Sequence, residues 1–235
     1  MTEQVSVPAT ASGVPLHFAH GDTTLNSPTV QSVADGRLLH ALFVDSLTGV
    51  YTRAYATGRA QQLLKSARAA RVAMLVVNVD GFSRIKDIAD YDLGDRLLRS
   101  VAQRLARALA TNDLLARIGG DEFLIVTERH GHMPMLAAFA QQMLALFAEP
   151  FVIAGREYRV SASVGVARSN DGARDASLLM RDAGAAMRRA KVHAPGNVCF
   201  FTRDMKEAAQ RRFAIENRLR DALKAGELTI AYQPV

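Results

Sequence analysis

The chain has 235 residues, of which 49% are hydrophobic and 22% charged, a composition that favours one soluble globular domain or one domain plus a fragment. The single cysteine excludes an intramolecular disulfide and a zinc site built from cysteines. No stretch approaches the roughly 18 uninterrupted apolar residues of a membrane span, and no secretory signal is visible, so we predict a cytoplasmic location and no membrane segment.

The net charge of +6 does not by itself predict a nucleic-acid-binding protein. The chain has no Trp, and no basic patch is interleaved with aromatic residues. Arginines recur instead at helical spacing, as at Arg99, Arg104 and Arg107. This spacing indicates a solvated helix face, with some affinity for polyphosphate as an additional property. We therefore expect no nucleic-acid partner.

The predicted elements alternate between helices and strands after an irregular beginning. Residues 1–36 are predicted to be a tail or a linker, because Thr, Ser, Pro and Gly are frequent near the N-terminus. The following order of strand, helix, strand, strand, helix and strand, with additions, predicts an α+β fold with a ferredoxin-like βαββαβ core, a central antiparallel sheet flanked by helices. The expected helices cover about 54–70, 93–109, 135–147 and 176–191, and the expected strands cover 72–79, 114–116, 123–126, 151–153, 158–167 and 198–201.

The most informative motif is Arg-Ile-Gly-Gly-Asp-Glu-Phe-Leu-Ile-Val at 117–126. Its apolar flanks suit two strands, so Gly119 and Gly120 fall at a turn where the backbone can approach a ligand closely. Asp121 and Glu122 should point to opposite faces, which allows one carboxylate to bind a metal while the other serves a different role. An ordinary hairpin with polar turn residues is the alternative. The motif resembles the signature of the GGDEF family, the diguanylate cyclases and their inactive relatives.

Two further stretches extend this resemblance. Residues 45–53 resemble the opening motif of GGDEF domains, with Thr52 where the family usually has Asn. The end of the chain resembles the first residues of an EAL phosphodiesterase domain. We therefore interpret the chain as part of a bacterial tandem GGDEF-EAL protein; the alternative is a helix and strand native to the first domain. The interpretation assigns 37–203 to the GGDEF domain, 204–225 to a linker helix and 226–235 to the start of a truncated EAL domain.

The resemblance implies a fold like nucleotidyl cyclases and polymerase palms, and a specific chemistry. In active relatives two GTP molecules, one on each domain of a homodimer, react with the help of Mg²⁺ to give cyclic di-GMP. The implied sites are Glu122 and Lys191 for catalysis; Phe82, Lys86, Asp95, Gly119, Gly120 and Lys191 for nucleotide binding; Asp121, Val79 and Asn78 for the metal; and Asp113 for product inhibition.

The chain departs from the active family at one metal position. Asn78 stands where active relatives have the first metal-binding Asp. Its amide oxygen can coordinate a metal but carries no charge, so Asp121 would be the only remaining anionic side chain of the pair. Asp80, on the same face of the strand, is the alternative source of a second carboxylate.

Three other positions also depart from the family. Lys86 replaces an Asn that reads guanine, and a lysine can only donate hydrogen bonds. Pro195 stands where an Arg is expected four residues after Lys191, in a segment that carries one residue more than the family pattern. Ala110 replaces the Arg of the inhibitory site beside Asp113.

These departures predict a degenerate domain in cyclic di-GMP signalling, with weak or no cyclase activity. The predicted partners are GTP, with Mg²⁺ bound weakly, and a following EAL domain whose phosphodiesterase activity GTP regulates. The first alternative is a slow but active diguanylate cyclase. The second is a structural dimerisation module, which needs no nucleotide.

Overall fold

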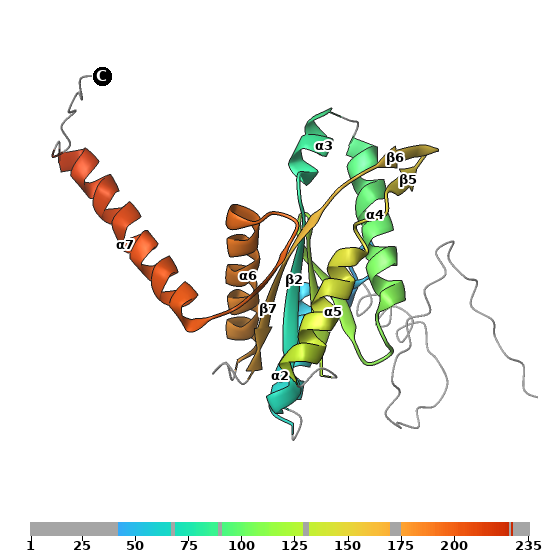
Figure 1. The fold of residues 1–235 in the computed structure, drawn as a ribbon, viewed down its shortest axis with the longest axis horizontal. Coiled ribbons are helices and arrows are strands. Elements are labelled where there is room, and N and C mark those ends of the chain that lie inside the picture. The colour runs from blue at the N-terminus through green and yellow to red at the C-terminus, as the bar shows by residue number, and fades with distance from the viewer. Residues whose placement is uncertain are drawn as a thin grey trace, which may run out of the picture.

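The computed structural model describes residues 42–66, 69–88, 91–128, 132–169, 175–225 and 227 (Figure 1). The predicted tail over 1–36 lies outside the described residues. So does the predicted start of an EAL domain over 226–235, apart from Glu227. None of the described helices is long and apolar enough to span a membrane.

The centre of the domain is a six-stranded sheet in the order β1-β3-β4-β2-β7-β8. The pairs β3-β4, β4-β2 and β2-β7 are antiparallel, whereas the edge strands β1 and β8 pair in parallel. The four central strands therefore have the order of a ferredoxin-like core, which confirms the predicted α+β fold. The strands are β1 (Tyr51–Thr52), β2 (Ala73–Val79), β3 (Leu114–Gly119), β4 (Glu122–Thr127), β7 (Ala162–Arg168) and β8 (Val198–Phe200).

Helices cover both faces of this sheet (Figure 1). On one face, α4 and α5 pack against alternate residues of β2, including Leu75 and Val77. On the other face, α2 and α6 pack against Met74 and Val76. The continuous apolar run of β2 thus reflects burial on both sides, as expected for a central strand. The helices are α2 (Arg53–Leu64), α3 (Phe82–Ile88), α4 (Tyr91–Ala108), α5 (Met133–Ala145), α6 (Ala176–His193) and α7 (Arg203–Ala225), with a short 3₁₀ helix η1 (Ala69–Arg71).

The largest differences from the predicted boundaries occur in two elements. The helix predicted over about 54–70 ends at Leu64, where the Ser66 hydroxyl donates to the Leu63 carbonyl at 2.7 Å and satisfies one of the terminal acceptors. The single strand predicted over 158–167 is two strands. Its first residue ends β6 (Arg156–Tyr158), which pairs with β5 (Phe151–Ile153) in a separate two-stranded sheet, and the chain then enters the main sheet as β7.

Arg104 on α4 joins this helix to the segment between α5 and β5. Its guanidinium donates to the carbonyls of Leu146, Glu149 and Pro150 at 2.9, 2.6 and 2.7 Å. It also lies 3.6 Å from the centre of the Phe151 ring, a cation–π contact. One side chain therefore satisfies three carbonyl groups at the end of α5 and beyond it.

We expect Arg104→Met to lower the free energy of unfolding by about 2 kcal/mol or more, because it removes charge-assisted hydrogen bonds from partly buried carbonyls. The methionine retains the apolar stem that covers Phe151. Arg107→Met is the matched control on the next turn of α4, where the arginine is exposed, and should change stability by less than about 0.5 kcal/mol. Urea denaturation followed by circular dichroism measures both. Equal losses in the two variants would contradict this role of Arg104.

The last helix, α7, leads away from the sheet (Figure 1). Its first turn is attached to the domain by Met205, which is buried with the α2 and α6 residues, and by an ion pair of 3.3 Å between Arg189 and Asp204. Farther along, Ile215, Leu219 and Leu223 are exposed at spacings of four residues. This spacing places them on one side of the helix.

Candidate functional site

The end of the central strand β2 carries the first predicted site residue, Asn78. It lies between Glu122 of β4 and Ser163 of β7 in the sheet register, and only 3% of it is exposed. Its side chain is on the face covered by α6, where its Oδ1 accepts a hydrogen bond of 2.8 Å from the Lys191 ammonium. The structure therefore joins two predicted site residues that are 113 positions apart, and the amide oxygen proposed for a metal faces a cation instead.

Asp80, the alternative carboxylate near Asn78, is held by hydrogen bonds from both sides. Its Oδ1 accepts from the Ser163 hydroxyl at 2.9 Å. Its Oδ2 accepts from the Ser161 hydroxyl at 3.0 Å and from the Gly196 backbone N–H at 3.2 Å. These donors fix the carboxylate against β7 and the segment after α6, so its oxygens already have partners within the protein.

Glu122 begins β4 beside Asn78 and is partly buried. Burial raises the pKa of its carboxyl above the ordinary range, and the neighbouring Asp121 adds to the rise. The positive charges of Arg188, Lys191 and Arg53 act in the opposite direction. Glu122 therefore lies within the electrostatic reach of cations from both α2 and α6, and burial outweighs their effect on its pKa.

The raised pKa of Glu122 predicts how stability depends on pH. Because the folded state holds this proton more tightly than the unfolded state, the stabilisation is present below the ordinary Glu pKa of about 4.3 and is lost as pH rises through the folded pKa. Glu122→Gln stays neutral throughout. We expect the stability of this variant relative to wild type to increase between about pH 4 and about pH 7 in urea denaturation. A difference that does not change with pH would contradict the prediction.

The turn between β3 and β4 is formed by the signature glycines. Gly120 has a φ of +49° and Gly119 a φ of +153°, and a Cβ added at either would meet nothing within 4 Å. Both glycines are exposed, so the turn presents open backbone to a ligand. Its conformation favours glycine because other residues rarely adopt such positive φ values.

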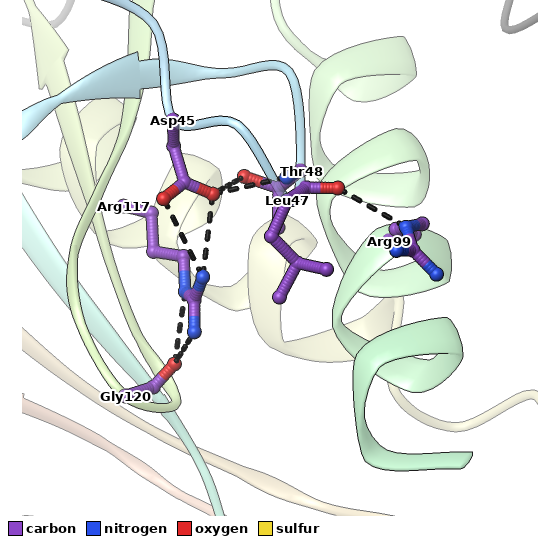
Figure 2. Close-up of polar contacts among 6 residues, drawn as sticks. All are labelled: Asp45, Leu47, Thr48, Arg99, Arg117 and Gly120. Atoms are coloured by element: carbon purple, nitrogen blue, oxygen red, sulfur yellow. Dashed lines mark hydrogen bonds and ion pairs between the residues drawn. The ribbon is translucent and has the colours of Figure 1, made fainter. Parts of the chain in front are cut away.

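Arg117 connects this turn to Asp45 through its guanidinium (Figure 2). Its Nε and Nη2 donate to the Gly120 carbonyl at 2.9 and 2.8 Å, and its Nη1 lies 3.3 Å from Asp45 Oδ1. Burial alone would raise the pKa of Asp45, but hydrogen bonds from Thr48 and the Arg117 guanidinium outweigh it and hold the pKa below its usual value. The opening motif of the domain is thereby tied to the signature turn.

The other predicted residues are more widely spread. Phe82 begins α3 and is buried against the α4 side of the sheet. Asp95 is exposed on α4, and Lys86 belongs to α3, although its side chain lies outside the described residues.

The predicted inhibitory and metal positions lie in two other places. Asp113 accepts a hydrogen bond of 3.1 Å from the backbone N–H of Ala110, the residue that stands in place of the family arginine, in the turn before β3. Val79 donates its N–H to the Asp121 carbonyl at 3.1 Å, which places these two predicted metal residues side by side.

Comparison with known protein families matches residues 42–196 to the family described as diguanylate cyclase, GGDEF domain. The matched range covers well over half of the chain and contains the whole site described above. The chain belongs to the GGDEF family. The predicted resemblance is thus confirmed at the level of the family.

Relatives of known sequence support the same assignment for this GGDEF domain. The chain is 32% identical over 203 residues to the bifunctional diguanylate cyclase/cyclic di-GMP phosphodiesterase MucR of Pseudomonas aeruginosa, covering 86% of this chain. It is 32% identical over 206 residues to the cyclic di-GMP phosphodiesterase PdeR of Escherichia coli, covering 88% of this chain. The chain spans only 30% and 31% of the lengths of these two relatives.

Solved structures have the same fold as this GGDEF domain. The GGDEF domain of YfiN (TpbB) from Pseudomonas aeruginosa is 29% identical, with a TM-score of 0.68 over 71% of this chain and 99% of that one. A sensory box/GGDEF family protein from Caulobacter crescentus is 32% identical, with a TM-score of 0.60 over 63% of this chain and 97% of that one. The cyclase-like arrangement of sheet and helices is therefore shared with crystal structures.

The side chains of this GGDEF domain do not fit a divalent cation well. Mg²⁺ prefers anionic oxygens in near-octahedral geometry. The Asn78 oxygen is neutral and accepts from Lys191, and both oxygens of Asp80 accept from protein donors. Within the described ranges, no group of three or more His, Cys, Asp or Glu residues could hold a metal. Asp121 is thus the remaining anion of the predicted metal set.

Several residues around the site were not predicted to belong to it. Arg53 and Arg188 act electrostatically on Glu122, and Ser163 holds Asp80. Arg188 could have been found from its place three residues before Lys191, because such residues lie on one side of a helix. Arg117 directly precedes the signature glycines, yet nothing in the sequence pairs it with Asp45, 72 positions away.

Proposed function

We propose that this GGDEF domain binds GTP without converting it efficiently to cyclic di-GMP, and that bound GTP regulates a following EAL phosphodiesterase domain. The contact between the Lys191 ammonium and Asn78 Oδ1, at 2.8 Å, carries the proposal. A carboxylate at this place would hold a metal against the reacting phosphates, whereas an amide bonded to an ammonium does not. The parts that receive a phosphate chain, namely the open Gly119-Gly120 turn and Lys191, are retained.

The regulatory part of the proposal is supported by the connection from α6 to α7. Lys191 is close in sequence to Arg189, whose guanidinium pairs with Asp204 on the first turn of α7. The exposed stripe of Ile215, Leu219 and Leu223 gives α7 an apolar surface for a second contact. The names of the relatives MucR and PdeR include a phosphodiesterase activity, and both relatives are much longer than this chain.

Regulation requires GTP to bind two conformations with different affinities, which limits the effect to that difference, typically about 1–3 kcal/mol. We therefore expect GTP to change the phosphodiesterase rate of a longer protein containing the EAL domain. The upper limit of this change lies between about fivefold and about 150-fold. Tight GTP binding without any change of that rate would refute the regulatory role alone.

A slow diguanylate cyclase is the second candidate, because Glu122 and the signature turn are intact. Calorimetric titration with GTP and Mg²⁺, followed by chromatography of the same sample for cyclic di-GMP, tests both candidates. We expect binding with negligible product, and Asn78→Asp alone should not restore full activity because Lys86 and Pro195 remain. Turnover of about 1 per second or faster by the wild-type domain would exclude the first candidate. Absence of nucleotide binding would instead favour a structural dimerisation module.

A further inference from the structure

Three protein side chains supply positive charge around Glu122 and the end of β2. Arg53 from α2 and Arg188 and Lys191 from α6 all act on Glu122, and all three are exposed residues. Of these, Lys191 reaches the end of β2 and donates to the neutral oxygen of Asn78. Because an amide carries no charge, Asn78 does not offset the charge of Lys191, and Glu122 is the carboxylate that interacts with this ammonium.

We infer that this domain binds the triphosphate of a nucleotide without a divalent cation, with Lys191 as the principal counter-charge and Arg188 beside it. The inference rests on the proposed function, since it concerns the same GTP-binding site. A carboxylate at position 78 would both attract a metal and neutralise Lys191. Asparagine at this position neither attracts a metal nor neutralises Lys191. The phosphate chain therefore contacts the Lys191 ammonium in place of a metal ion.

The hydrogen bonds of Asp80 argue against a displaced metal site in the same region. A cation there would compete with the Ser161 and Ser163 hydroxyls and the Gly196 N–H for the two carboxylate oxygens. Lysine and arginine, by contrast, bind phosphate directly through charge-assisted hydrogen bonds. The arrangement thus favours direct recognition of phosphate by protein cations.

Calorimetric titration of the chain with GTP, in excess EDTA and separately in excess Mg²⁺, tests the inference. We expect dissociation constants that agree within about threefold, because no bound metal has to form part of the site. Lys191→Met should weaken binding in EDTA by about tenfold or more. Lys65→Met removes the same charge from an exposed residue just after α2 and is the matched control, with affinity unchanged.

Asn78→Asp provides the reverse test. In EDTA the new carboxylate should neutralise Lys191 and repel phosphate, so GTP binding should weaken by about fivefold or more, and Mg²⁺ should restore it. Circular dichroism of each variant verifies folding. If this buried substitution unfolds the chain, the comparison of Lys191→Met with Lys65→Met decides alone.

The outcomes separate the two levels of the proposal. GTP binding by the wild-type chain in Mg²⁺ but not in EDTA would overturn metal-free binding while leaving the proposed function intact. Equal affinities of wild type and Lys191→Met in EDTA would overturn the assignment of Lys191. Absence of binding under both conditions would overturn the proposed function, and the inference with it.

Discussion

Gly165→Ala is expected to unfold the domain or to leave it only marginally stable. Gly165 lies in the middle of β7, directly beneath α6. A Cβ placed there would lie 2.0 Å from the Met187 backbone nitrogen and 2.1 Å from the Ala183 carbonyl oxygen. Both atoms belong to the backbone of a helix, so no side-chain rotation can relieve the clash, and α6 must move away from the sheet.

The expected loss is at least about 3 kcal/mol, the upper end of the usual cost of overpacking, out of a typical total stability of about 5–15 kcal/mol. Gly58→Ala is the matched control, since Gly58 is exposed on α2 and its added Cβ would meet nothing within 4 Å. This change should stabilise the domain by about 0.4–1 kcal/mol. Thermal and urea denaturation compare the two. A midpoint for Gly165→Ala equal to that of wild type would show that α6 does not lie so close to β7.

Gly120→Val is expected to abolish GTP binding, with an affinity reduced by about a hundredfold or more. The open space at Gly120 is where the proposed site presents its backbone, and a branched side chain would fill it. Valine also resists the φ of +49°, so the turn would change shape and lose the carbonyl position that Arg117 holds. Calorimetric titration with GTP measures the effect.

Gly155→Val is the matched control for the backbone strain. Gly155 has a φ of +76° and open space around it, but it lies in the separate turn between β5 and β6. The Gly155→Val variant should be less stable than wild type but should retain its affinity for GTP. Glu122→Gln should likewise leave binding within about threefold, because by family analogy this carboxylate serves the reacting hydroxyl more than the bound nucleotide. Equal GTP affinities in wild type and Gly120→Val would refute the assignment of the turn to the site.

Much of the fold could be predicted because local patterns and tertiary packing agree. The apolar run that becomes β2 is buried on both faces, and the apolar stripe of α4 faces the sheet, so each pattern has a single structural solution. The strand predicted over 158–167 was wrong at its beginning for the opposite reason. Residues on both sides of the break are extended, and only their partners, β5 in one case and β2 in the other, separate them.

The residues of the candidate site come from the family resemblance and stay a prediction, whereas the contacts among them could not be predicted from the sequence. Family resemblance marked Asn78 as a missing carboxylate and Lys191 as a phosphate ligand. That these two side chains bond to each other depends on how α6 lies across β2, which no local pattern contains. The same holds for Asp80, whose donors come from β7 and from the segment after α6. The hydrogen bonds of the Asp80 carboxylate to the protein can be seen only in the assembled fold.

The shortness of both edge strands limits how two copies of this domain can associate. At one edge β1 has two residues, and at the other β8 has three. Long exposed edges invite another chain to extend the sheet through its backbone, and very short ones discourage this. Intermolecular sheet formation, including fibril growth from the native state, is therefore disfavoured at both ends. Pairing of two copies is expected to depend on side-chain surfaces of helices and loops, which point mutations can separate from folding.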